Sequence, residues 1–454
     1  MATTIREQLE LEVFEALEFN RPDTLRDLLA DKHPADIADV LERLNDDHRY
    51  DVFQLLAPEM QAQVLDDIGS DATRNLLTRM EPEDVGDLLD QMPMDEAVEI
   101  LTEDVPEFQE TFLAEMEPED AAEIERLLQY PSESAGLLMT EQYVAISKDM
   151  TAAQALAYVR KVNEEVETVT NLYVLNGGRR LIGVISLREL ITQPPSRRIE
   201  EFMETQLITV RPEDDQEIAA RLVERYNFLA LPVVNENNKM LGIITIDDII
   251  DVLLEENSED IMRFGGVEGG DEMDQPYFTM PVFRVLRSRF GWLLLLMLAY
   301  TLTDAVMRLF DQQLSAVVAL TFYIPLLIGT GGNAGAQTVS TIIRGLAVQD
   351  IRFRDIFRVF QRELVSGFIL GLALSFVVAG RSYLSDGDMR LSLVVATAII
   401  AICTWANVMG AIIPMIAKRL GLDPALVSAP LISTLVDATG MFIYLSIATL
   451  VLGL

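Results

Sequence analysis

Cysteine, histidine and tryptophan are all scarce in this chain of 454 residues, which contains one cysteine, two histidines and two tryptophans. The single cysteine, Cys403, excludes an intrachain disulfide. His33 and His48 lie in the acidic N-terminal stretch, and no nucleophile–base arrangement accompanies them, so the sequence does not favour an enzyme. Basic residues are also few: 35 Lys and Arg stand against 72 Asp and Glu, and the net charge of −37 argues against a nucleic-acid partner.

The N-terminus lacks the apolar core of a secretory signal, so we expect the first half of the chain to stay in the cytoplasm. That half is rich in Asp and Glu, whereas apolar runs dominate after Phe283. A chain of this length and uneven composition predicts a multidomain protein. Acidity of this kind suits a surface that attracts cations, and a general solubilising role is the alternative.

Residues 1–137 are predicted to form an acidic N-domain of helical repeats. Short amphipathic segments begin at His33, Glu81, Pro93 and Glu117, each with a proline or an acid at its start and apolar residues at three- and four-residue spacing. The repetition indicates an α-helical superhelix. Its acids are either a metal-sensing face or the ordinary solvated face of repeat helices.

Residues 138–255 contain two α/β units of the same layout. Each has an apolar strand, a polar turn, a strand in which Gly183 or Gly242 occupies the same place, and then a helix; the second unit opens with a strand at Leu207. The repeat resembles a tandem pair of cystathionine-β-synthase (CBS) domains. That resemblance implies a module that binds ATP or another adenine nucleotide, or one that only dimerises and regulates; Arg188, Glu189 and Phe228 are the candidate nucleotide contacts.

A helix is predicted from Ile246 to Phe264, within an acidic connecting segment of residues 246–275. Acids are dense along it, and Gly265 and Gly266 close it. A helix that leaves a sensor and reaches a membrane is a plausible lever, and an acidic linker is the alternative.

Residues 283–454 are predicted to form a membrane domain of five helical spans, since roughly 20 apolar residues cross a bilayer. The predicted spans are Leu286–Phe310, Ser315–Leu346, Phe357–Leu384, Leu391–Leu420 and Pro424–Leu454. Basic residues gather before the first span and in the loops after the second and fourth. The N-terminus is therefore expected inside and the C-terminus outside.

Asp437 lies near the middle of the last span, where a bare carboxylate costs on the order of 3 kcal/mol. We expect it to face a water-filled path for a cation. Pro430 lacks a backbone donor and is expected to free carbonyls one turn away, and Ser433 and Thr434 add hydroxyls toward Asp437. Oxygen ligands of this kind suit Mg²⁺ or Ca²⁺. One acid per chain suits a hydrated ion held by a symmetric dimer.

The second span is rich in glycine, which permits either close helix packing or a broken helix that lines a path. Asn333 and Gln337 share a face of it and have two readings, as contacts to the water shell of an ion or as hydrogen bonds between helices, the latter favoured for Gln337.

Taken together, the acidic helical domain, CBS pair, acidic helix and five spans resemble the MgtE family of magnesium transporters, most specifically at Pro325–Gln337 and Pro430–Asp437. The resemblance implies a homodimeric Mg²⁺ channel in the inner membrane, with Asp437 as the ion-recognition residue and with closure by intracellular Mg²⁺. The family's acidic pair near the inner end of the connecting helix falls on Glu259 and Asp260. Candidates for the sensing clusters are Asp90, Asp95, Asp247, Asp251 and Glu255.

One position departs from the family pattern, because Ala429 stands where a polar residue, often Asn, is expected before the proline. It offers only a carbonyl, which puts affinity and selectivity in question. Two other functions stay open: transport of another divalent ion such as Co²⁺ or Ca²⁺, and a membrane-anchored nucleotide sensor. The lack of Cys, His and Met at the site counts against soft metals.

Overall fold

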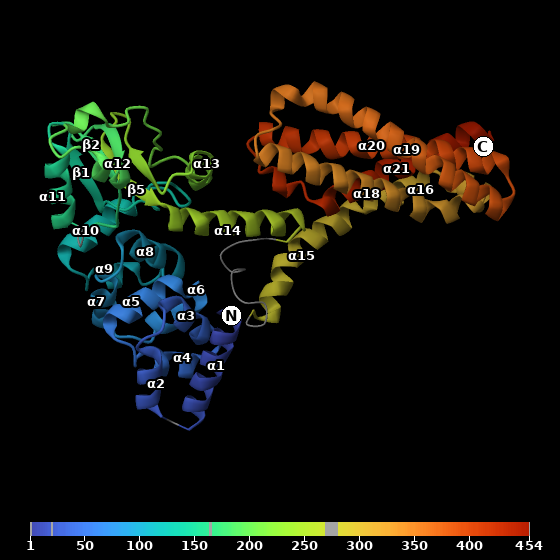
Figure 1. Cartoon of the computed structure of the whole chain (residues 1–454). Helices are drawn as coiled ribbons and strands as arrows, with labels where there is room; N and C mark the ends of the chain where they lie inside the picture. Colours follow the sequence, from blue (N-terminus) through green and yellow to red (C-terminus); the bar gives the residue numbers. More distant parts are fainter. Residues whose placement is uncertain (1, 20, 163–165, 268–279, 454) are drawn as a thin grey trace. The chain divides into compact units, whose positions relative to one another are not determined.

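A computed structural model describes residues 2–19, 21–162, 166–267 and 280–453 (Figure 1). The chain divides into two compact units. The first contains residues 1–256 and the second contains residues 257–273 and 277–454, apart from the stretches that are not described. Each unit is treated by itself below.

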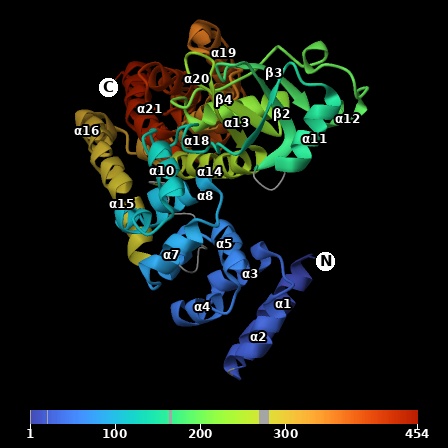
Figure 2. The same cartoon turned by 90° about the vertical axis from the view of Figure 1, so that its left-hand side faces the viewer.

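The first unit begins with an array of short helices (Figure 2). They are α1 (Ala2–Glu18), α2 (Pro22–Leu29), α3 (Pro34–Arg43), α4 (Asp46–Phe53), α5 (Pro58–Asp67), α6 (Ser70–Leu77), α7 (Pro82–Leu89), α8 (Met94–Glu99), a π-helical turn (Ile100–Asp104), α9 (Gln109–Leu113) and α10 (Pro118–Leu127). Proline opens five of these helices, where its missing N–H costs no hydrogen bond. The segments predicted to begin at His33, Glu81, Pro93 and Glu117 are confirmed as helices, each starting one residue later, at Pro34, Pro82, Met94 and Pro118. His33 and His48 are exposed.

Two α/β units follow. The first holds β1 (Tyr143–Ser147), α11 (Ala152–Val162), β2 (Thr168–Leu175), β3 (Leu181–Ser186) and α12 (Leu187–Thr192). The second holds α13 (Gln216–Tyr226), β4 (Ala230–Val234), β5 (Met240–Thr245) and the start of α14 (Ile246–Phe264). In the first sheet β1 runs parallel to β2 and β3 antiparallel to it; in the second, β4 and β5 are antiparallel.

The predicted internal repeat is confirmed in the register of the strands, because Gly183 pairs with Val174 and Gly242 pairs with Val233. The strand predicted at Leu207 is wrong in extent. Only Val210 reaches the sheet there, through one parallel bridge to Val233 in the place that β1 takes in the first unit. Val210 is the buried residue of this segment, and Leu207 and Ile208 pack half-buried against two different hydrophobic clusters.

One hydrophobic core joins the helical array to the second α/β unit. It runs from α1 residues such as Val13 through Leu41 and Leu101 to Ile244 and Val252. A second cluster around Tyr173 and Ile243 joins the two sheets. The helical array is therefore fixed against the start of α14, which lies beside it in Figure 1.

The second unit is helical. After the end of α14 it contains α15 (Val282–Ala299), α16 (Thr301–Leu309), α17 (Asp311–Ala316), α18 (Ala319–Ala347), α19 (Ile356–Asp386), α20 (Met389–Arg419) and α21 (Ala429–Leu452) (Figure 1). α20 packs against α18, α19 and α21, and its apolar residues form the core of the bundle. The helix predicted over Ile246–Phe264 is confirmed as α14.

Among the described residues, four segments are long and apolar enough to cross a membrane: Val282–Leu309, Phe353–Asp386, Met389–Arg419 and Ala429–Leu452. These match four of the five predicted spans. The fifth prediction falls on α18, which has 29 residues but carries glycine, threonine and amide side chains through its middle, and these lower its hydropathy.

Candidate ion pathway and cation-sensing face

Asp437 lies on α21, eight residues after the helix begins, and its side chain is half-buried. Within the described part of the chain, no side chain donates a hydrogen bond to its carboxylate. The neighbouring polar groups are already engaged elsewhere, since Thr439 accepts from Trp405 Nε1 at 2.9 Å and donates to Leu435 O at 2.8 Å. The carboxylate is thus available to a ligand from outside the chain.

α18 approaches α21 closely because glycines face it. A Cβ built on Gly332 would lie 2.5 Å from Ser433 Oγ, and one on Gly331 would lie 3.1 Å from Val436 Cγ1. Gly335 meets Ile432 in the same way, so the two helices run in opposite directions. Asp437, next to Val436, therefore lies near the level of Gly331. Of the two expectations for the glycine-rich segment, close packing is confirmed, and the broken helix is wrong because α18 is continuous.

The other candidate oxygens differ in availability. Asn333 is exposed and Ser433 is half-buried, whereas the Thr434 hydroxyl donates to Pro430 O at 2.9 Å. Gln337 is also exposed, so it does not join helices within this chain.

The expectation that Pro430 frees carbonyls within the last span is wrong, because Pro430 does not interrupt a helix. α21 begins at Ala429, and Pro430 occupies its first turn, where a helix has no carbonyl partner for its N–H in any case. Ser428 caps the helix instead, accepting from Leu431 N.

A second acid within a membrane span, Glu363 on α19, was missed. Asn407 Nδ2 on α20 donates to Glu363 Oε2 at 3.3 Å, and Asn407 is 5% exposed. The signal in the sequence was an acid at the edge of an apolar run, beside the basic residues of the preceding loop, which hid it. The pair links α19 to α20, whereas Asp437 lies on α21.

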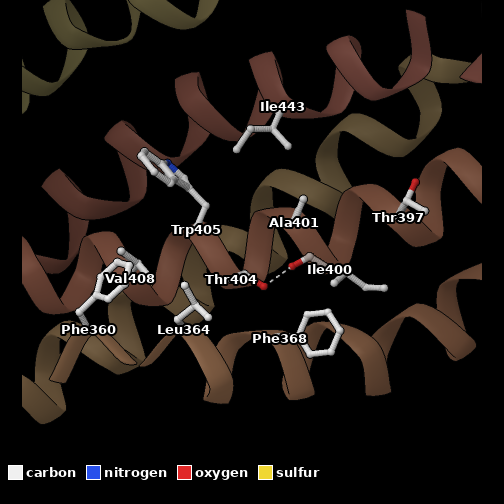
Figure 3. A pocket seen from close by; sticks show the side chains of 10 residues that line it. All are labelled: Phe360, Leu364, Phe368, Thr397, Ile400, Ala401, Thr404, Trp405, Val408 and Ile443. Atoms are coloured by element: carbon white, nitrogen blue, oxygen red, sulfur yellow. Dashed lines mark hydrogen bonds between the residues drawn. The ribbon is translucent and has the colours of Figure 1, made fainter. Parts of the chain in front are cut away.

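A cavity with a volume of about 600 Å³ lies among α19, α20 and α21 of the membrane unit (Figure 3). Its wall is apolar, formed by residues such as Phe360, Phe368 and Ile443. The Thr404 hydroxyl beside it donates to Ile400 O at 2.7 Å, the dashed line in Figure 3. A wall of this chemistry suits hydrocarbon and offers nothing to an ion.

In the first unit, acids from three helices converge. Asp95 on α8 is 9% exposed; its pKa is raised by burial and then by the nearby carboxylates of Asp248 and Glu167. Burial followed by a hydrogen bond to Asp66 raises the pKa of Glu96 to about 11. We call the set of carboxylates on α5, α8 and α14, together with Glu167, the acidic face; its members are Asp66, Asp67, Asp95, Glu96, Glu99, Glu167, Asp247, Asp248, Asp251 and Glu255.

Carboxylates of this face on α14 also have raised pKa values. Burial raises the pKa of Asp248 to about 6, against the hydrogen bonds it accepts from Thr245 N (3.0 Å) and Thr245 Oγ1 (2.5 Å). Burial, with Glu103 and Glu255 nearby, raises the pKa of Glu99 to about 8, although this side chain still reaches solvent. The face therefore holds more negative charge than its surroundings stabilise, and a cation would relieve it.

The structure brings together Asp95, Asp247, Asp251 and Glu255 among the predicted metal residues. Asp90 lies apart: its Oδ2 accepts from Glu117 N at 3.0 Å, and its charged neighbours are Asp120, Glu117 and Asp87. Glu259 and Asp260 belong to the second unit, where Glu259 pairs with Arg263. Sequence reasoning missed Asp66, Asp67, Glu96, Glu99, Glu167 and Asp248 as members of this face. Of these, only Glu99 follows Asp95 at the four-residue spacing of one helix face.

Across the described residues, no group of three or more His, Cys, Asp or Glu side chains has the geometry of a ready-made metal centre. The acidic face and Asp437 thus fit an ion that keeps part of its water shell better than a dehydrated one. Mg²⁺ has this preference.

The three residues predicted to contact a nucleotide have different structural surroundings. Glu189 caps α12, accepting from Ser186 N at 3.1 Å and from Ser186 Oγ at 3.0 Å, and Arg188 beside it is exposed. Phe228 stacks on Tyr226 with ring centroids 5.6 Å apart. A cavity of about 490 Å³ in the first α/β unit is lined instead by Leu156, Val159, Arg160, Val169, Leu187 and Ile191.

Three protein-family models match the chain. The MgtE model, described as a divalent cation transporter, matches residues 324–447. The MgtE intracellular N domain matches residues 32–133, and the CBS domain matches residues 135–195 and 199–255.

The magnesium transporter MgtE of Thermus thermophilus is 40% identical over 99% of this chain and 99% of its own length. The magnesium transporter MgtE of Bacillus subtilis is 36% identical over 72% of this chain and 71% of its own length. A crystal structure of the cytosolic domain of the Mg²⁺ channel MgtE in complex with ATP is 33% identical, with a TM-score of 0.51, covering 54% of this chain and 99% of that one. The chain therefore belongs to the MgtE family of magnesium transporters, multi-pass membrane proteins with cytosolic N-terminal domains, and is not an enzyme.

Proposed function

We propose that this protein is a homodimeric, channel-type Mg²⁺ transporter of the inner membrane, with five spans, an outer C-terminus and closure by intracellular Mg²⁺. The family places Mg²⁺ as the cargo. The boundaries we propose are an N-domain over residues 1–137, a CBS pair over 138–255, a connecting segment over 246–275 and a membrane domain over 283–454.

The observation that carries the pathway is the open carboxylate of Asp437 beside the glycine-packed contact of α18 and α21. A mid-span acid is expensive unless it faces water or a cation. Asn333 and Ser433 lie on the same pair of helices, with side chains that are not buried. With Ala429 and Thr434 contributing backbone and hydroxyl oxygens, two chains would surround a hydrated ion with two carboxylates.

The acidic face supports the feedback. Its carboxylates have raised pKa values because they are buried against one another. Without a cation, repulsion favours separation of the helical array from α14; with Mg²⁺ shared between them, the contact holds. Asp95, Asp247, Asp251 and Glu255 are the sensing residues we propose, and Glu259 and Asp260 act near the membrane end of α14. Asp90 is the weakest member of this set because it lies apart.

Adenine nucleotide binding at the CBS pair is a separate proposal. The crystallised MgtE cytosolic domain in complex with ATP supports it, since that protein is 33% identical. Arg188 and Phe228 are the exposed and half-buried candidates, and Glu189 would contribute only if it left its capping role. Saturable ATP binding by the full chain tests the proposal.

The experiment for the pathway is Mg²⁺ uptake into liposomes by the full chain, with low or high Mg²⁺ on the cytoplasmic face. Asp437→Ala is expected to abolish uptake, because the cation loses its only charged partner in the span. Glu363→Gln is the matched control, an intramembrane acid with a partner inside the chain, and is expected to keep Asp437-dependent uptake.

Uptake by wild type that depends on Asp437 and decreases with cytoplasmic Mg²⁺ supports both pore and feedback. Equal uptake by Asp437→Ala would contradict the pathway. Preference for Co²⁺ or Ca²⁺ over Mg²⁺ would favour the other-divalent alternative. A wild type that carries no ion yet binds nucleotide would indicate a membrane-anchored sensor.

A further inference from the structure

The polar side chains in the wall of the cavity among α19, α20 and α21 are already engaged within the chain (Figure 3). Thr397 and Thr404 each donate to a carbonyl one turn earlier, at 2.8 and 2.7 Å, and Trp405 Nε1 donates to Thr439 Oγ1 at 2.9 Å. The other side chains of the wall are hydrocarbon. The cavity therefore fits a hydrocarbon ligand.

The cavity opens on the outside of the helix bundle. Leu364, Phe368 and Trp405, which line it, are 38 to 49% exposed. All three helices around it are candidate membrane spans, so the medium at the opening is lipid. An acyl chain of the bilayer can enter it from the side.

The apolar face of α19 continues beyond the cavity toward the start of the helix. Phe357, Phe360, Leu364 and Phe368 follow one another at three- and four-residue spacing and so share one face. The Phe357 ring stacks on that of Phe360, with centroids 6.5 Å apart. Phe353, in the turn that leads into α19, extends the same aromatic row.

A positive charge lies at this end of the row. The Arg419 guanidinium is 5.1 Å from the centroid of the Phe353 ring. Arg419 ends α20 and lies three helical turns after Val408, on the side of α20 that forms the cavity wall. It is exposed, and no acid among the described residues forms an ion pair with it.

The distance from this charge to the far end of the cavity matches one lipid molecule. Phe353 and Phe368 are 15 residues apart, which corresponds to about 22 Å along a helix. Half of a bilayer with its headgroups is roughly 20–23 Å thick. A phosphate at Arg419 and a chain end at Phe368 are therefore compatible with a single phospholipid.

We propose that this protein binds an anionic phospholipid, with one acyl chain in the cavity among α19, α20 and α21 and the phosphate at Arg419. Exposed Arg352 and Arg354, which flank Phe353, add positive charge at the same end and favour an anionic headgroup over a zwitterionic one. An apolar helix of a second copy would fit the wall but would bring no anion to Arg419. The site goes beyond the proposed transport and does not depend on it; with the five spans proposed above, the lipid belongs to the cytoplasmic leaflet.

The test uses the fluorescence of Trp405, which lies in the cavity wall. The chain has two tryptophans, and Trp292→Phe leaves Trp405 alone. The full chain is placed in phosphatidylcholine bilayers that contain brominated phosphatidylglycerol or brominated phosphatidylcholine with the same acyl chains. Because bromine quenches only nearby tryptophan, we expect phosphatidylglycerol to quench with about fivefold higher apparent affinity, the effect of one basic side chain on an anionic lipid.

Two further variants in this background locate the headgroup and the chain. Arg419→Gln should remove most of the preference for phosphatidylglycerol, because it removes the charge beside Phe353. Ala401→Phe should lower quenching by both lipids, because its ring occupies the space of the chain.

Arg289→Gln is the matched control. It removes one exposed arginine from α15, a helix that does not line the cavity, and should keep the preference of the parent. As a measurement without the tryptophan substitution, phosphatidylglycerol should raise the thermal unfolding temperature of the full chain in detergent more than phosphatidylcholine does, and Arg419→Gln should reduce that difference.

Four results would overturn the proposal. Equal quenching by the two lipids would mean that the headgroup is not recognised, and a preference that survives Arg419→Gln or disappears in Arg289→Gln would mean that Arg419 does not bind it. Quenching that Ala401→Phe leaves unchanged would place the chain outside the cavity. Absence of quenching by either lipid would indicate that a helix of a second copy covers the opening.

Discussion

Glu363 and Asp437, two of the carboxylates within candidate membrane spans, are held in different ways. Glu363 accepts a hydrogen bond from Asn407, whereas no described side chain donates to Asp437. An acid that is satisfied within the chain joins helices, and one that is left open can receive a ligand. The difference supports our proposal that Asp437 serves transport, while Glu363 joins helices.

The glycines of α19 also differ in their surroundings. A Cβ on Gly371 would lie 2.7 Å from Ile400 Cα, a backbone atom that cannot move aside, whereas nothing lies within 4 Å of one on Gly380. We expect Gly371→Ala to destabilise the membrane unit by about 1–3 kcal/mol, because the helices must separate. The measurement is the thermal stability of the full chain in detergent.

Gly380→Ala is the control on the same helix and should leave stability unchanged or slightly higher, since alanine favours the helix. Equal losses in the two variants would mean that glycine acts through α19 alone rather than through its contact with α20.

At the residue scale the sequence predicted that Asp437 lies within an apolar helix, and its role there stays a prediction, whereas the expected effect of Pro430 was wrong. Composition reveals a charge in an apolar run. It does not reveal that the helix begins one residue before Pro430, because that start depends on the Ser428 cap and on the turn that precedes it. The contact of Glu363 could not be predicted either, because its partner Asn407 is 44 residues away in the sequence.

At the scale of elements, α14 was predicted at the bounds it has, because periodic apolar residues and a closing glycine pair mark it. The acidic face was predicted only in part. Asp95 and Asp251 were named, but their convergence with Asp66 and Glu167 depends on how α5, α8 and α14 pack. Such packing is set by a core that joins residues more than 200 positions apart.

The acidic face predicts a pH dependence. The carboxyl pKa values of Asp248 and Glu99 are raised to about 6 and about 8, above their ordinary values of 3.8 and 4.5. The folded chain therefore holds protons that the unfolded chain has released, and the free energy of unfolding decreases as pH rises from about 4 to about 8. We expect the thermal unfolding temperature of the full chain without Mg²⁺ to be lower at about pH 8 than at about pH 5.

Mg²⁺ should reduce that difference, because it replaces the protons between the carboxylates. Asp248→Asn should reduce it as well, by removing one of the groups that titrate. An unfolding temperature that rises over this pH range, or that responds equally with and without Mg²⁺, would contradict a cation-stabilised face.

At the scale of the whole molecule, the order of domains was predicted from composition and repeats, and the number of spans is the point still to be tested. α18 lies below the hydropathy of the other four segments, because its glycines and Asn333 serve packing and a polar surface. The proposal that α18 is a fifth span therefore rests on its small and polar residues rather than on its hydropathy.

Five spans predict that the two ends of the chain lie on opposite sides of the membrane. A cysteine added after Leu454 should react with a membrane-impermeant maleimide on intact cells, while Gly177→Cys, in an exposed turn of the first α/β unit, should react only after permeabilisation. Background labelling is expected to be low, because Cys403 is buried. Protection of the added cysteine in intact cells would indicate an even number of spans.

The helix α15 has one more consequence. Within the described residues none of its side chains is buried, and Phe290, Leu293 and Met297 are all open. A helix whose apolar side chains are this exposed can partition into lipid before the rest of the bundle packs against it. It precedes the other apolar helices of this sequence, so it can be inserted while they are still being synthesised, and the arginines near its start favour one direction of insertion. The composition of α15 is thus suited to membrane insertion as well as to the folded state.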